Sequence, residues 1–169
     1  MIIRGASKRR AVREGERVYR NNAEKFYRAL NGMERDPNVR LMKQYTQHKG
    51  NPTFSHCRSV AVSSFRLAQK LGWRIDETAL ARGAMLHDFH LYTRQREHIN
   101  FLRHAFDHPR LALRNAENVF ALSDKEKNII MSHMWPLTVF SVPKSKEAVL
   151  VTLADKYCAF REMRGRRCG

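Results

Sequence analysis

Residues 147–163 read EAVLVTLADKYCAFREM, and this stretch decides the fold class. Its apolar side chains recur at helical spacing, as expected of a helix that packs against other elements. They belong to Val149, Leu150, Leu153 and Tyr157. Asp155 stands in the middle of the stretch, and a buried carboxylate is costly unless it is paired or binds a metal. We therefore expect a packed helix with one polar group that needs a partner, for which Lys156 or partial exposure are the alternatives to a metal.

The rest of the chain carries the same helical pattern between signals for helix starts and stops. The expected helices cover residues 14–31, a short segment after Pro37, then residues 53–71, 77–88, 107–120, 123–135 and 147–163, with an irregular segment at 89–106. β-Branched residues fall within these patterns and not in alternating runs, which argues against strands. We therefore predict an all-α, single-domain helical bundle. Residues 51–169 should form its main domain, and residues 1–50 should form N-terminal helices packed on it or appended to it.

Length and composition exclude several classes of protein. Apolar residues make up 43% of the 169 residues and are spread along the chain, which argues against disorder. No apolar run is long enough to span a membrane, and residues 1–20 turn basic before a signal-type stretch could form. Cys57, Cys158 and Cys168 are too few for a disulfide framework, so we expect reduced thiols. The expectation is a soluble cytoplasmic protein without a membrane partner.

The formal net charge of +16 is the strongest deviation in composition. A positive field of this size attracts nucleotides, nucleic acid or phosphorylated metabolites, although a solvated basic surface explains it equally well. Arginine and lysine are dispersed, with short clusters at residues 8–10 and 164–167. The charge therefore indicates the sign of a partner and not its identity.

Histidines and aspartates recur at the ends of the expected helices and inside the last one. Imidazole nitrogens and carboxylate oxygens are ligands for zinc, iron and manganese, and donors on separate helices can converge in a folded bundle. A single histidine at a helix end is more often a cap or a solvated side chain, so the prediction depends on the whole set. In chain order the set is His56, His87, Asp88, His108, His133 and Asp155.

Three segments resemble, in order and approximate spacing, the ligand motifs of the HD phosphohydrolase superfamily. They are FSHCRSVA at residues 54–61, GAMLHD at residues 83–88 and LADK at residues 153–156. A His-Asp dipeptide alone carries little information. Here it ends an Ala/Leu-rich helix, after one helical histidine and well ahead of an Ala-Asp in a late apolar helix. The resemblance covers roughly residues 54 to 160.

This resemblance implies a metal site and a reaction. A first metal ion would be bound by His56, His87, Asp88 and Asp155. His108 and His133 match the positions that bind a second ion, and Asp88 would bridge the two. The implied cofactor is one or two divalent transition metals (iron, manganese or zinc), since these ligands permit each of them. The implied reaction is hydrolysis of a phosphoester or phosphoanhydride by metal-activated water, with a nucleotide or a related small phosphorylated molecule as substrate.

Two cations close to the expected ligands are candidate contacts to substrate phosphate. Arg58 follows His56, and Lys156 follows Asp155, although both could be surface residues. Relatives often carry Gly-Lys shortly after the His-Asp pair, whereas this chain reads FHLY at residues 89–92. His90 could line a substrate mouth, with a surface position as the ordinary alternative.

Two other functions fit parts of the sequence. One is a basic helical protein that binds nucleic acid without catalysis, in which the histidines are incidental and no metal is stoichiometric. The other is a di-iron oxygenase of the HD type, which oxygen uptake would identify. The sequence does not name the substrate, the metal or the oligomeric state.

Overall fold

The computed structural model describes residues 3–46, 50–91, 101–166 and 168. Within them the chain forms seven α-helices, one short 3-10 helix and no strand. The helices are α1 (Ile3–Leu30), η1 (Met33–Arg35), α2 (Pro37–Leu41), α3 (Thr53–Lys70), α4 (Glu77–Leu86), α5 (Phe101–Val119), α6 (Asp124–Ser132) and α7 (Lys146–Met163). The prediction of an all-α fold is confirmed.

Helix starts follow the capping residues that the sequence displays. The Asp36 side chain accepts a hydrogen bond from the backbone N–H of Asn38 at the start of α2, and Asp76 accepts one from Ala79 at the start of α4. Ser123 forms a full capping box with Glu126 at the start of α6. These side chains satisfy backbone donors that the first turn of a helix leaves without partners. The predicted starts of these helices are therefore correct where a capping side chain sets them, whereas α4 and α6 end at Leu86 and Ser132, two and three residues earlier than predicted.

Two predicted helix starts were wrong. Helix α1 begins at Ile3 and not near residue 14, and α5 begins at Phe101 and not at Asp107. The prediction placed Pro109 in a first turn, where proline is favoured, but it lies inside α5. Residues 101–106 contain no glycine or proline, so the helix extends ahead of Pro109 at the cost of one backbone hydrogen bond. The rest of the irregular segment, residues 92–100, lies outside the described part.

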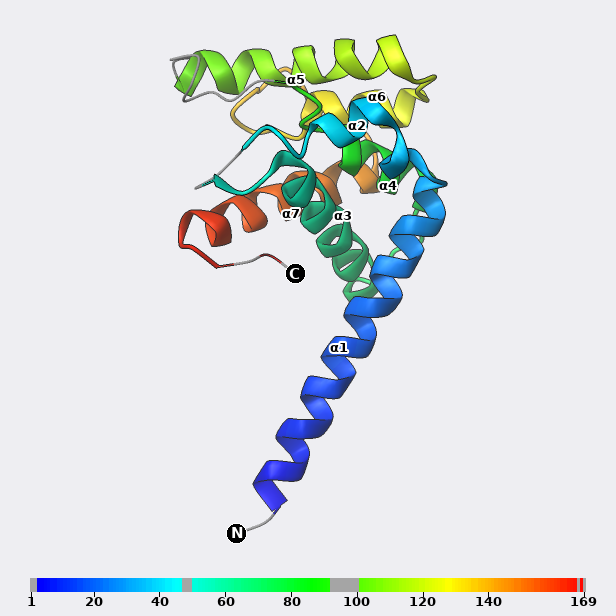
Figure 1. Ribbon diagram of the computed structural model, residues 1–169, viewed down its shortest axis with the longest axis vertical. Helices are drawn as coiled ribbons and strands as arrows, with labels where there is room; N and C mark the ends of the chain where they lie inside the picture. The colour runs from blue at the N-terminus through cyan, green and yellow to red at the C-terminus, as the bar shows by residue number, and fades with distance from the viewer. Residues whose placement is uncertain (1–2, 47–49, 92–100, 167, 169) are drawn as a thin grey trace.

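The helices pack around one core. Helix α3 contacts α7, α4 and α1, while α6 connects α4, α5 and α7. Figure 1 shows α5 at one end of the body, and α3 and α7 on the side from which α1 projects. The first fifty residues contribute Phe26, Leu30 and Val39 to the same core cluster as α3 and α7. The division of the chain at residue 50 stays a prediction. None of the described helices combines the length and apolar character that crossing a membrane requires.

The cysteines differ from the prediction. Cys158 in α7 and Cys168 near the C-terminus form a disulfide, whereas Cys57 is a free, buried thiol. The prediction of three reduced thiols was therefore wrong for two of them. It counted cysteines along the chain, but the chain turns back after α7 and brings Cys168 to Cys158. The cytoplasmic location stays a prediction.

Gly83 sets the distance between α4 and α6. A Cβ atom on Gly83 would stand 2.7 Å from Cδ1 and 3.0 Å from Cβ of Ile129, which is fully buried. These separations are shorter than ordinary carbon contacts, so a side chain here would push the two helices apart. The close approach also affects the candidate site. His87 and Asp88 stand at the end of α4, so a shift of this helix would move both side chains.

Gly83→Ala should lower the free energy of unfolding by about 1–2 kcal/mol, because overpacking outweighs the better helix preference of alanine. The matched control is Gly15→Ala, where no atom lies within 4 Å of the added Cβ. Urea denaturation should show no loss for the control. Equal effects of the two substitutions would contradict the close packing of α4 on α6.

Candidate metal centre

The six predicted ligands come from five helices and meet in the interior. His56 lies in the first turn of α3, His108 in α5 and Asp155 in the middle of α7. His87 and His133 are the C-terminal caps of α4 and α6, and Asp88 follows His87. All six are at least nine-tenths buried. Helix ends and, for His108 and Asp155, positions inside a helix therefore carry these polar groups into the interior.

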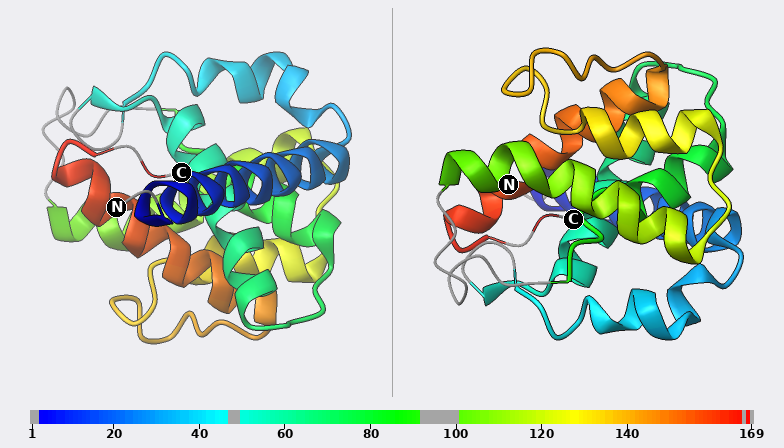
Figure 2. Two further views of the ribbon diagram at one scale, coloured as in Figure 1. Left: turned by 90° about the horizontal axis from the view of Figure 1, so that it is seen from below. Right: turned by 90° about the horizontal axis from the view of Figure 1, so that it is seen from above.

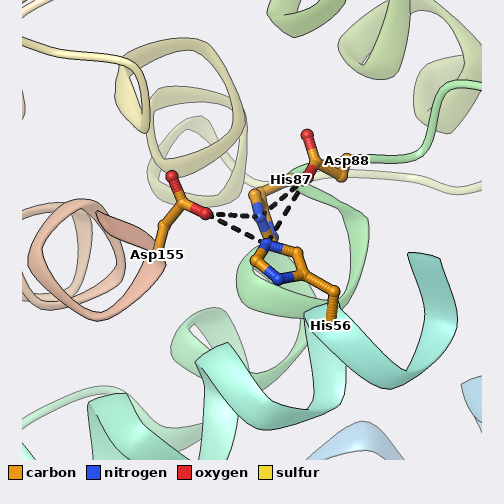
Figure 3. A group of neighbouring side chains, drawn as sticks. All are labelled: His56, His87, Asp88 and Asp155. Carbon is orange, nitrogen blue, oxygen red and sulfur yellow. Dashed lines mark hydrogen bonds and ion pairs between the residues drawn. The ribbon is translucent and has the colours of Figure 1, made fainter. Parts of the chain in front are cut away.

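Four of these side chains form a first group, drawn in Figure 3. His56 Nε2 lies 3.0 Å from Asp155 Oδ1 and 3.7 Å from Asp88 Oδ2. His87 Nε2 lies 3.3 Å from Asp88 Oδ2 and 3.7 Å from Asp155 Oδ1. Ligands about 2.1 Å from a tetrahedral metal ion stand roughly 3.4 Å apart. The separations thus fit one metal ion at the centre of the four atoms.

A second group shares Asp88 with the first. Asp88 Oδ1 lies 3.4 Å from His108 Nε2 and 3.6 Å from His133 Nε2, and these three residues also meet the geometric requirement for a metal. The two imidazole Nε2 atoms are 2.7 Å apart. Two neutral nitrogens that both present lone pairs would repel at this distance, so the pair needs a proton or a cation. Asp88 therefore presents one oxygen to each group, as a bridging carboxylate does.

The histidines are oriented by partners on their other ring nitrogen. His87 Nδ1 lies 2.7 Å from the carbonyl oxygen of Ala84, and His133 Nδ1 lies 2.7 Å from that of Ile130. Each N–H donates to a carbonyl one turn earlier in its helix, which leaves Nε2 as the atom that faces the cluster. The buried Nε2 of His87 has no hydrogen-bond partner among the described residues. This tautomer is the one that binds metals.

His56 is oriented by a carboxylate that the sequence analysis missed. Its Nδ1–H donates to Glu162 Oε2 at 3.0 Å, and Glu162 is buried. Carboxylates in this position fix the ring of a metal-binding histidine and raise its basicity. A signal was present in the sequence, because Glu162 follows Asp155 by seven residues and so lies on the same face of α7.

Charges around the cluster shift the pKa values of its members. Burial would lower the pKa of His56, but its hydrogen bonds to Asp155 and Glu162 raise it to about 10. Burial would also lower the pKa of His87, but the charge of Asp88 is the main cause that holds it well above its ordinary value. Without a metal these two rings are therefore imidazolium ions. A metal ion would take the place of their Nε2 protons.

The pKa values of Asp88, Asp155 and His133 are lowered instead of raised. Burial would raise the pKa values of Asp88 and Asp155, but the neighbouring histidines hold both well below the ordinary range. Burial and the neighbouring His108 lower the pKa of His133 to about 3. The cluster thus offers ionised carboxylates and a neutral imidazole, which are the ligand forms that divalent metals require.

The two candidate substrate contacts have different positions. The Lys156 ammonium group donates to the carbonyl oxygen of His133 at 2.9 Å, and burial lowers its pKa against the opposing charge of Asp155. It therefore lies at the edge of the cluster. The Arg58 guanidinium lies 5.7 Å from the ring centre of Tyr27 in α1. Arg58 is two residues beyond His56 on α3, about 200° around the helix. The structure does not bring it to the cluster.

His90 is buried, although a surface position was the ordinary expectation. Its Nδ1 lies 3.8 Å from Asp88 Oδ1, and its ring lies against that of His108 with centres 5.6 Å apart. Asn115 in α5 donates to the carbonyl oxygen of Phe89 at 2.9 Å and so fixes the segment that leads to His90. His90 therefore lies next to the candidate ligands Asp88 and His108.

Comparison with protein-family models matches residues 53–159 to the family described as HD domain. The matched segment begins with the first residue of α3 and ends in α7, and it contains all six candidate ligands. No curated protein and no solved structure gives a significant match.

Glu162→Gln should weaken metal binding about 10-fold to 100-fold, because the amide loses the charge that supports His56. Titration of metal-free protein against a chelating dye measures the affinity. Glu117→Gln, at an exposed position in α5, is the control and should bind as the wild type does. An unchanged affinity for Glu162→Gln would contradict a positioning role for this carboxylate.

The stability of the metal-free protein should depend on His56. Its pKa is about 10 when folded against an ordinary value of 6.5, so the folded state holds its proton more tightly. The stabilisation is complete below pH 6.5 and is lost as the pH rises toward about 10. Urea denaturation in the presence of chelator should show this loss, and His56→Asn should reduce it. A stability that rises through the same window would contradict the assignment.

Proposed function

Because the chain belongs to the HD-domain family, which more than half of its length matches, we propose that it is a phosphohydrolase with two divalent transition-metal ions. It hydrolyses a phosphoester or phosphoanhydride with metal-activated water. The substrate is a nucleotide or a related small phosphorylated molecule. The metal is iron, manganese or zinc.

One observation carries the proposal of two ions. Asp88 directs Oδ2 toward His56 and His87, and directs Oδ1 toward His108 and His133. A carboxylate shared in this way between two sets of imidazoles is the arrangement that bridges a metal pair. Asp155 completes the first set only. The proposed ligands are therefore four residues for the first ion and three for the second, with Asp88 in common.

The chain's own residues supply binding and orientation. Metal ions held in such a pair lower the pKa of a bound water toward neutrality and offset charge on a phosphoryl group. Glu162, Ala84 and Ile130 hold three imidazoles in place, so little reorganisation is needed during the reaction. Asp88 and Asp155 stay ionised and balance the charge of the protonated His56 and His87 before metal binds. No protein nucleophile is required.

The net charge of +16 supports an anionic substrate, since a positive field concentrates anions near the protein. Lys156 is the candidate cation for a substrate phosphate, because it lies beside Asp155 and holds the backbone of His133. Arg58 has no contact with the cluster that supports the same role.

The test combines metal analysis with assays of phosphoester hydrolysis. Protein purified without chelator or histidine tag should contain about two equivalents of transition metal. His108→Ala should lose the second ion, and Asp88→Asn should lose both ions and at least about 1000-fold in rate. Asp124→Asn, at an exposed position in α6, is the matched control. In the same assay, Lys156→Met should raise KM and Arg58→Gln should not.

Several outcomes would contradict the proposal. One equivalent of metal that is lost with Asp155→Ala, but kept in His108→Ala, would leave a single-metal site. Asp88→Asn with wild-type turnover under controlled metal would exclude the mechanism. Iron-loaded protein that consumes oxygen and leaves phosphoesters intact would identify an oxygenase. No bound metal, even after reconstitution, would exclude a metal enzyme.

A further inference from the structure

A groove of about 370 Å³ runs between α3 and α7, on the side of α7 away from the metal cluster. From α3 it is lined by Ser63, Arg66 and Lys70, and from α7 by Leu153, Ala154 and Tyr157. No carboxylate is among the described residues that line it. Its walls are therefore cationic and apolar at once.

Exposed aromatic side chains continue the groove along α7, and each has an arginine over its ring. Tyr157 is 53% exposed and Phe160 is 50% exposed. The Arg161 guanidinium lies 5.7 Å from the centre of the Tyr157 ring and donates to its hydroxyl, and that of Arg164 lies 4.2 Å from the centre of the Phe160 ring. Large aromatic rings that are half exposed to solvent do not gain the full free energy of burying apolar surface. Their exposure between cations suggests a ligand that is both planar and anionic.

The disulfide holds the basic C-terminal tail at the same groove. Cys168 is bonded to Cys158, and the Sγ atoms of both lie within 3.6 Å of Oγ of Ser63, one of the lining residues. Arg164 and Arg166, which precede Cys168, are exposed. The tail thus adds positive charge beside the groove.

The N-terminal half of α1 adds a second positive surface. Residues 3–20 contain seven arginines and lysines and two glutamates, and Asn22 is the first buried residue among those of α1 whose burial is described. Arg13, Arg17 and Arg20 are exposed, and Arg17 forms an ion pair with Glu14. Figure 1 shows this half extending from the body on the side of α3, α7 and the C-terminus, and the view from below in Figure 2 agrees.

We propose that the groove between α3 and α7, together with Arg13, Arg17 and Arg20 of α1, binds single-stranded nucleic acid. Arginines and lysines along a groove contact the phosphates, and exposed aromatic rings stack on unpaired bases. Duplexes offer phosphates but no free base faces, so this surface favours single strands.

This binding surface is separate from the proposed hydrolase site. Ala154 lines the groove, whereas the next residue, Asp155, faces the metal cluster. Neither the arginines nor the aromatic rings of the groove are candidate metal ligands. A test of nucleic-acid binding at this surface is therefore independent of the proposed hydrolysis.

The experiment measures fluorescence anisotropy of labelled single-stranded RNA and DNA oligonucleotides, and of the matching duplexes, with the full chain. Arg66→Gln/Lys70→Gln and Arg13→Gln/Arg20→Gln should each weaken single-strand binding about tenfold and flatten its salt dependence. Tyr157→Ala should weaken it about tenfold, and Tyr157→Phe should restore most of it. The matched control, Arg110→Gln/Arg114→Gln, removes two exposed charges from α5 at the opposite end of the body and should change binding less than twofold.

Circular dichroism and metal content should be the same for all variants. Equal loss in the control variant would show that net charge alone drives binding and would overturn the proposal. Duplex binding as tight as single-strand binding, or no effect of Tyr157→Ala, would exclude stacking. Binding to anionic phospholipid vesicles without binding to oligonucleotides would show that the surface belongs to a membrane partner instead. Tighter binding of single-stranded RNA than of single-stranded DNA, or the reverse, would support the proposal and identify which nucleic acid the surface prefers.

Discussion

The charge of Asp88 is the constraint on which the rest of the structure depends. An ionised carboxylate in a closed core is stable only among several cations or donors, and four of the candidate ligand histidines surround this one. To supply them, α3, α4, α5 and α6 each place a histidine at one point. The helical bundle is therefore organised around a polar centre.

Helix ends make this arrangement possible. His87 and His133 stand where α4 and α6 stop, so each ring can hydrogen-bond a carbonyl of its own last turn. Helix α7 holds the end of α6: Thr152 donates to the carbonyl of Ser132, and Lys156 to that of His133. The close approach of α4 to α6 at Gly83 keeps the two histidine-bearing ends together. Backbone geometry thus determines the site as much as the choice of side chains does.

The sequence predicted the fold class and brought the six candidate ligands into one set, because helix caps and ligand order are local or linear signals. It missed contacts that exist only after folding. Glu162 pairs with a residue 106 positions away, and Cys168 reaches Cys158 through a reversal of the chain. Arg58 seemed close to His56 in sequence but projects from another face of α3. The early start of α1 was missed because no residue type that favours a helix start precedes Ile3, whereas that of α5 was missed although Asn100, a capping residue type, stands before Phe101 in the sequence.

The long separation between the donors has a consequence for how the chain folds. His56 and Asp155 are 99 residues apart, so their encounter closes a loop that includes most of the core. Closing such a loop costs more entropy than local helix formation, and contacts of this kind form late. A metal ion therefore cannot nucleate this fold as it does in a zinc finger. A metal ion at the candidate site would bind a scaffold that is already assembled, and its occupancy would report whether the chain has completed its topology.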